Sequence, residues 1–139
     1  MSSRRQARVL AFQALFAHDA AGLASSELAG LGWVDQDKLA GLDEETKVFA
    51  RFLLVGAIEN LVAIDAAIEK QLKNWDMKRL SKVDLALLRL GAYALLFQRD
   101  IPATVTIDES VEIAKEYGST DSYKFVNGIL DAVLKARGD

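Results

Sequence analysis

The sequence of 139 residues contains no cysteine, one proline and one histidine. The absence of cysteine excludes disulfide bonds, thiolate metal sites and cysteine nucleophiles together. With His18 as the only histidine, a metal site built from several imidazoles is also excluded. No glycine-rich phosphate loop of the Walker or dinucleotide type occurs. We therefore expect a protein that is not an enzyme and that holds neither a cofactor nor a metal ion.

Long apolar runs are missing as well. The first residues carry charge without the apolar run of a signal peptide. The longest apolar stretch, residues 83–97, contains Asp84 and Arg89 and is shorter than the roughly 20 residues that span a bilayer. Apolar residues still make up 51% of the chain, which is enough to bury a core. We expect a cytoplasmic protein with one domain over residues 1–139 and no membrane contact.

Apolar residues recur at every third and fourth position, and alternating β-branched runs are nearly absent, so the pattern predicts an all-α fold. A helix from Ser3 becomes apolar on nearly all sides after two turns, which is typical of a central, buried helix. Residues 21–42 predict one or two short helices with loops. Asp43 is expected to cap a long helical segment over residues 43–73, divided near Asn60.

The second half predicts three more helices. An almost wholly apolar helix is expected over residues 80–97, followed by a loop over residues 99–105. Thr106 and Glu109 have the spacing of a capping box, which predicts the start of the next helix. Gly118 predicts a left-handed end to that helix.

The last helix is expected to start at Asp121 or Ser122. Two aromatic residues near its start, Tyr123 and Phe125, offer stacking faces, and Lys124 offers a cation, beside free backbone donors as in a nucleic-acid site. Periodicity alone is equally consistent with Phe125 as a core residue. Gly128 inside this helix predicts a close approach to the backbone by a neighbouring helix or a ligand.

Charge is distributed unevenly along the chain. Residues 1–18 carry Arg4, Arg5 and Arg8 and no acid, a net +3, whereas the rest holds 14 basic and 20 acidic residues, a net −6. Arginine forms a planar fork that matches phosphate and also stacks on bases. The three arginines therefore indicate either a local anion-binding site or a solubilising segment.

Two other charged clusters are interpreted as solvated surface. The basic cluster is diluted by acids and consists of Lys70, Lys73, Lys78, Arg79 and Lys82. The acidic one has helical spacing, which is more typical of an exposed helix face than of paired catalytic carboxylates, and consists of Asp108, Glu109, Glu112 and Glu116.

Three groups of residues together resemble the family of the transcription antitermination factor NusB. The first is residues 4–8 with residues 13–16, and the second is residues 79–84 with residues 88–90, Tyr93 and Leu95. The third and most specific group is residues 101–102, 107–109, 112–115 and 125–131. The resemblance covers essentially the whole chain and is weakest over residues 21–42.

The resemblance implies an all-α, NusB-like fold of about seven helices in two three-helix subdomains. It also implies pairing with NusE, a small-subunit ribosomal protein, and binding of boxA RNA in ribosomal RNA transcripts. Such a factor acts with RNA polymerase and other Nus factors to promote processive transcription and rRNA maturation.

Site residues carried over from the family form two groups. Arg4, Arg5 and Arg8 match its arginine-rich RNA-binding start, and three residues near the expected RNA path match as well: Asp121, Lys124 and Phe125. The expected NusE-facing residues are Phe16, Leu80 and Asp84. A helical adaptor without RNA contact, with a homodimer covering its binding surface, is the second interpretation. A domain that keeps a methyltransferase-related activity is the third.

Overall fold

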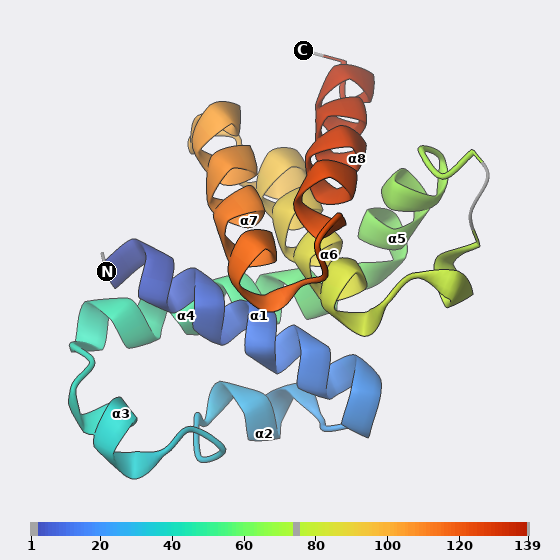
Figure 1. Cartoon of the computed structure of the whole chain (residues 1–139). Helices are drawn as coiled ribbons and strands as arrows, with labels where there is room; N and C mark the ends of the chain where they lie inside the picture. The colour runs from blue at the N-terminus through green and yellow to red at the C-terminus, as the bar shows by residue number, and fades with distance from the viewer. Residues whose placement is uncertain (1–2, 74–75, 139) are drawn as a thin grey trace.

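The computed structural model describes residues 3–73 and 76–138 of the chain, and all regular structure in these ranges is helical, as predicted. The described residues form eight α-helices and one short 3₁₀-helix (Figure 1), in the order α1 (Ser3–Ala21), α2 (Ser25–Ala29), α3 (Gln36–Ala40), α4 (Glu44–Glu59), α5 (Leu61–Glu69), η1 (Met77–Arg79), α6 (Lys82–Phe97), α7 (Ala103–Tyr117) and α8 (Ser122–Ala136). The expected short helices of residues 21–42 are α2 and α3, each of five residues.

Several helix boundaries follow directly from the local sequence. Asp43 accepts a hydrogen bond from the backbone N–H of Thr46 at 2.8 Å, which confirms it as the cap of α4. Ser81 caps α6 in the same way, since its Oγ accepts from the backbone N–H of Asp84 at 3.0 Å. Asn60 separates α4 from α5, as the sequence predicts.

The prediction for the start of α7 is wrong. The helix begins at Ala103, three residues before the predicted start at Thr106, because Pro102 at the N-cap lacks only a backbone N–H that has no partner within the helix. Thr106 is therefore buried within the first turn, and its carbonyl accepts a hydrogen bond from Ser110 Oγ at 2.8 Å. The predicted capping box with Glu109 does not form, and Glu109 binds a different residue.

The left-handed end predicted at Gly118 is also wrong. Its φ of −94° and ψ of −176° are extended backbone that any residue adopts. A Cβ at this position would lie 2.5 Å from Ser122 Cβ and 2.8 Å from the Ala114 carbonyl oxygen. The glycine is required because the start of α8 approaches it closely, which the linear sequence does not reveal.

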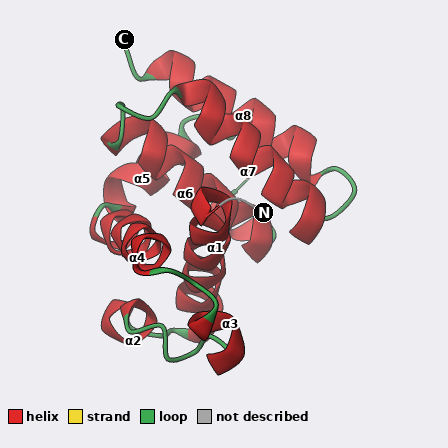
Figure 2. Cartoon of the chain, turned by 90° about the vertical axis from the view of Figure 1, so that its left-hand side faces the viewer, coloured by secondary structure: helices red, strands yellow, loops and turns green. Residues whose placement is uncertain are grey.

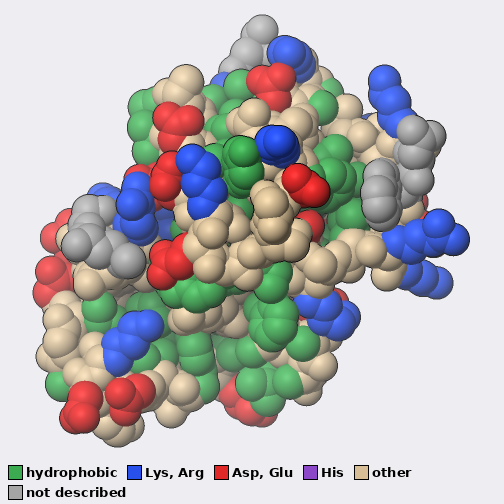
Figure 3. All heavy atoms as spheres, in the orientation of Figure 1, with side chains coloured by type: hydrophobic (Ala, Val, Ile, Leu, Met, Phe, Trp, Pro, Cys, Tyr) green, Lys and Arg blue, Asp and Glu red, His purple; other side chains and the backbone are tan. Residues whose placement is uncertain are grey.

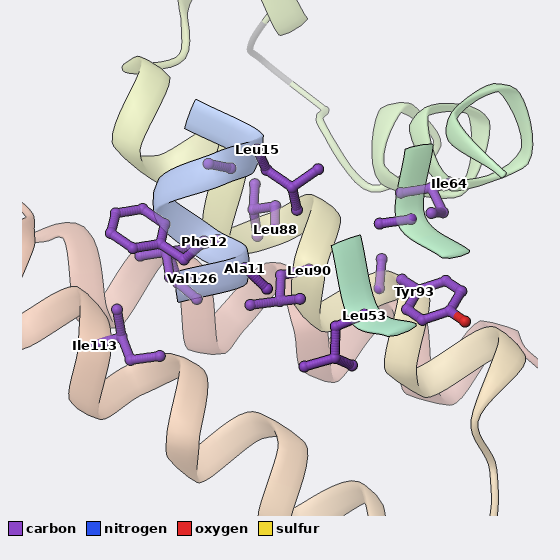
Figure 4. Packing of buried hydrophobic residues seen from close by; sticks show 14 of the residues in the cluster. Ala11, Phe12, Leu15, Leu53, Ile64, Leu88, Leu90, Tyr93, Ile113 and Val126 are labelled. Carbon is purple, nitrogen blue, oxygen red and sulfur yellow. The ribbon is translucent and has the colours of Figure 1, made fainter. Parts of the chain in front are cut away.

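Helix α1 is the central buried helix that its composition predicts, and it packs against α4 and α6. Figure 4 shows Ala11, Phe12 and Leu15 among the side chains of α4, α6, α7 and α8 in one apolar cluster. The buried residues of α1 are Ala7, Val9, Leu10, Ala11, Phe12, Ala14 and Leu15. Burial on this scale stabilises the fold and fixes the position of both ends of α1.

Helices α5 to α8 form one group beside α1, and α2 and α3 lie apart from that group. Helices α6, α7 and α8 contact one another as a three-helix bundle, and α5 packs on α6 and α8. Helices α2 and α3 lie at the opposite end of the molecule from the C-terminus in both views (Figures 1 and 2). No helix in the described ranges is both long and apolar enough to cross a membrane.

A network of ion pairs joins the C-terminal end of α1 to α5 and α6. Arg89 of α6 donates to both carboxylate oxygens of Asp65 in α5, each at 2.9 Å, and lies 3.5 Å from Asp19 of α1. Asp19 also accepts from Lys82 Nζ at 2.9 Å. Because Lys82 is the first residue of α6, this network holds the start of α6 against α1.

Two helical glycines have opposite surroundings. A Cβ at Gly56 in α4 would overlap the hydroxyl group of Tyr93, a residue of α6. The position of the Tyr93 side chain therefore requires a glycine there. No atom lies within 4 Å of a Cβ built at Gly128 in α8. Of the two predicted causes, the approach of a neighbouring helix is therefore wrong for the described residues, and the approach of a ligand stays a prediction.

Replacing these glycines by alanine should change the free energy of unfolding in opposite directions. We expect Gly56→Ala to lower it by roughly 1–3 kcal/mol, because Tyr93 must move. Gly128→Ala should raise it by up to about 1 kcal/mol through the higher helix propensity of alanine. Urea unfolding followed by circular dichroism measures both, and destabilisation of similar size by the two changes would contradict the packing described.

Candidate nucleic-acid interface

Four of the predicted site residues line one hollow on the surface. Leu80 and Asp84 come from the expected partner-binding group, and Asp121 and Phe125 come from the expected RNA-binding group. The hollow has a volume of about 360 Å³, and its full lining is Arg79, Leu80, Ser81, Asp84, Ser119, Asp121, Ser122 and Phe125. The start of α6 and the start of α8 therefore form the two walls of a common site.

The wall from α8 is shaped by the turn after α7. The backbone N–H of Ser119 donates to Ser122 Oγ at 3.0 Å, which orients the first turn of α8. Asp121 occupies the N-cap position and its side chain makes no capping hydrogen bond there. Its carboxylate is thus not used for helix capping, and Phe125 follows one turn later, partly exposed.

The wall from α6 contains a buried acceptor without a partner. Asp84 Oδ1 is buried and has no hydrogen-bond partner among the described residues. A buried polar atom left unpaired costs roughly 1–3 kcal/mol, so most such atoms in proteins are paired. Because surrounding atoms cover this oxygen, a donor from a molecule in the hollow reaches it only when the Asp84 side chain turns or its neighbours move.

A second, apolar hollow adjoins the first turn of α6. It has a volume of about 190 Å³ and is lined by Phe12, Gln13, Phe16, Val83 and Tyr117. Phe16 is 37% exposed and Tyr117 is 38% exposed, so both rings present apolar surface at this hollow. Val83 immediately precedes Asp84, so all three predicted partner-binding residues lie around the start of α6.

Arg5 is held by an acidic residue of α7. Its Nε and one terminal nitrogen donate to the two carboxylate oxygens of Glu109 at 2.7 and 3.1 Å. This hydrogen bonding holds the pKa of the Glu109 carboxyl below its usual value, so the pair is charged at neutral pH. The interpretation of Glu109 as part of a solvated face is corrected here, because its side chain is only 20% exposed and pairs with Arg5.

Arg4 and Arg8 share an aromatic ring. Their guanidinium carbons lie 4.1 and 5.6 Å from the ring centroid of Phe49, within cation–π range. Burial lowers the pKa of the half-buried Arg8, whereas Arg4 is exposed. The three arginines thus form a cluster at the N-terminal end of α1, joined to α4 through Phe49 and to α7 through Glu109.

The predicted RNA-binding residues therefore lie in two groups, since the arginines are at the start of α1 and Asp121, Lys124 and Phe125 are at the start of α8. On the face shown in Figure 3, basic side chains gather near the start of α1 and near η1. Hydrophobic side chains are exposed over the C-terminal half of α1 in the same view. The charged and apolar regions are separate parts of the surface.

The sequence does not predict that Lys115 of α7 joins Tyr123 and Lys124 of α8. Lys115 Nζ and Lys124 Nζ lie 5.4 and 5.8 Å from the ring centroid of Tyr123. Arg79, interpreted from the sequence as part of a solvated helix end, lines the hollow instead. Tyr123 and Lys124 are neighbours in the sequence, but only the packing of the helices brings Lys115 to the ring and Arg79 to the hollow, so the linear pattern carries little signal for those two.

Among the described residues, no group of three or more His, Cys, Asp or Glu side chains is arranged to hold a metal ion. The arrangement instead offers arginines for phosphate, a partly exposed aromatic ring, an unpaired buried acceptor and an apolar hollow. These groups are suited to binding by stacking and hydrogen bonding.

The chain is similar to known proteins of one family. The chain matches the model of the NusB family over residues 5–135. It is 47% identical over 133 residues to the transcription antitermination protein NusB of Treponema pallidum strain Nichols, covering 96% of this chain and 93% of that protein. The NusB protein of Treponema denticola is 42% identical, with 94% of each chain covered.

Solved structures show the same likeness. NusB of T. maritima superposes with a TM-score of 0.85 at 43% identity, covering 98% of this chain and 93% of that one. A crystal structure described as antitermination factors NusB and NusE in complex with dsRNA superposes with a TM-score of 0.86 at 31% identity, covering 98% of each chain.

Proposed function

This chain belongs to the NusB family of transcription antitermination proteins, and we propose that it pairs with NusE and binds the boxA element of ribosomal RNA transcripts. In this role it joins an antitermination complex on RNA polymerase with other Nus factors in the cytoplasm and promotes processive transcription and rRNA maturation. The observation that carries the proposal is the hollow between the starts of α6 and α8, which gathers Leu80, Asp84, Asp121 and Phe125. The solved complex of a related NusB with NusE and dsRNA supports the choice of ligands.

The proposed mechanism is binding, with no covalent bond made or broken. The arginine cluster contacts RNA phosphates, which sets the affinity and makes it depend on salt. Phe125, with Lys124 and Asp121 beside it, contacts an unstacked base and reads its edge. Because the whole chain carries a net charge of −3, indiscriminate attraction of RNA is limited and the specific contacts matter more.

The NusE-facing surface is proposed at the start of α6. Phe16 and its apolar hollow bury an apolar side chain of the partner. The Asp84 carboxylate, whose Oδ1 has no partner among the described residues, turns to accept a hydrogen bond from a separate donor group of NusE. Since Asp84 and Phe125 line the same hollow, NusE bound there adjoins the RNA. This shared site gives a physical reason for the pair to bind RNA more tightly than the protein alone.

The double variant Arg4→Ala and Arg5→Ala should weaken RNA binding and leave NusE binding nearly intact. The loss of two phosphate contacts to a single strand lowers the slope of log affinity against log salt by up to about 1.4. Fluorescence anisotropy over a salt series measures the slope. Lys70→Ala with Lys135→Ala, an equal charge change at exposed residues elsewhere, is the control. An unchanged affinity and slope in the arginine variant would refute the assignment of the arginines.

Asp84→Lys should abolish pairing with NusE, because a cation replaces an acceptor whose oxygen is buried in the proposed interface. We expect a loss of roughly 100-fold or more in affinity for NusE, measured by isothermal titration calorimetry. Asp100→Lys makes the same charge reversal at an exposed residue beyond the other end of α6 and should have little effect. NusE affinities that remain equal in the two variants would place the interface elsewhere.

A further inference from the structure

Glu109 binds Arg5 in the geometry with which an arginine binds a phosphate. Two nitrogens of the guanidinium fork donate to two oxygens of one anion, at 2.7 and 3.1 Å. The two residues are 104 positions apart in the chain, so the fold and not the local sequence brings them together. An RNA phosphate that uses the same edge of Arg5 must therefore displace the carboxylate of Glu109.

The pair is accessible to such a competitor. The Arg5 side chain is 37% exposed and that of Glu109 is 20% exposed, so the pair is not enclosed in the core. An adjoining hollow of about 260 Å³ is lined by Arg5, Glu112, Ile113, Lys115 and Glu116. Space for an incoming group thus lies directly beside Arg5.

Two further carboxylates of α7 lie near Arg5 without forming the fork. Glu112 and Glu116 follow Glu109 at helical spacing and line the hollow beside Arg5. Glu112 is itself paired with Lys115 at 3.3 Å. Among the described residues, no hydrogen bond joins Glu112 to Arg5. Among these acids, the fork with Arg5 is made by Glu109.

We propose that Glu109 determines RNA specificity by occupying Arg5 in the free protein, so that Arg5 contacts RNA only after a phosphate displaces the carboxylate. The proposal rests on the proposed function and adds a residue that lowers the affinity for unrelated RNA. Exchanging a carboxylate for a phosphate replaces one pair of charge-assisted hydrogen bonds with another, so the exchange alone adds little affinity. An RNA already held at α8 presents its phosphate at a high effective concentration and completes the exchange.

The opposite role for the same contact would be positioning. In that case Glu109 would hold Arg5 in place while the remaining donors of the guanidinium bind RNA, and loss of the carboxylate would weaken binding. The two roles predict changes of opposite sign, which makes a substitution of Glu109 decisive.

The test compares Glu109→Gln with Glu112→Gln, which removes the same charge one turn further along α7 without touching the fork. Binding of a boxA RNA and of a scrambled RNA of equal length is measured by fluorescence anisotropy, with the protein alone and with saturating NusE. We expect Glu109→Gln to tighten binding of the scrambled RNA roughly fivefold and to reduce the preference for boxA. Glu112→Gln should change either affinity less than about twofold.

A second comparison shows whether Glu109 acts through Arg5. In an Arg5→Ala background, Glu109→Gln should no longer tighten binding, because the residue that it occupies is gone. Circular dichroism confirms that each variant is folded. Weaker binding by Glu109→Gln, equal effects of Glu109→Gln and Glu112→Gln, or the same gain without Arg5 would each overturn the inference.

The outcomes also separate this inference from the proposed function. If the wild-type protein with NusE shows no preference for boxA, the proposed function fails, while the role of Glu109 is still decided by the scrambled RNA. If boxA is preferred and Glu109→Gln has no effect beyond that of Glu112→Gln, only the inference fails. If no variant binds either RNA, both are wrong.

Discussion

The burial of α1 between α4 and α6 is the constraint on which the rest of the structure depends. Its apolar side chains enter the core that α4, α6, α7 and α8 share, so the two ends of α1 are placed rigidly on the surface. One end carries the arginine cluster toward α4 and α7. The other end carries Phe16 and, through Asp19 and its ion pairs, holds the first turn of α6, where Asp84 lies.

Those features of the fold that depend on local physics could be predicted from the sequence. The 3.6-residue periodicity identified an all-α chain and its central helix, and Asp43 marked a helix start through a bond to its own segment. Predictions failed where a distant residue decides the outcome. Gly118 is needed because α8 approaches it, and Glu109 pairs with Arg5 across the fold instead of capping α7.

The same distinction applies to the site. Residue types and family resemblance pointed to the arginines, to the start of α8 and to the start of α6 as separate features. That Leu80, Asp84, Asp121 and Phe125 line one hollow depends on how α6 packs against α8, which no linear pattern contains. The unpaired oxygen of Asp84 and the fork between Arg5 and Glu109 are likewise properties of the folded chain. The folded chain thus leaves a carboxylate oxygen of Asp84 without a partner, whereas Arg5 already binds Glu109.

The most direct test of RNA reading by the pair is the affinity of the wild-type protein for a labelled boxA RNA and for a scrambled control, measured by fluorescence anisotropy with and without NusE. NusE should tighten binding of boxA RNA and increase the preference of the protein for boxA over the scrambled sequence. Equal binding of both RNAs in the presence of NusE, or no binding of either, would contradict it and would leave a helical adaptor that does not read RNA.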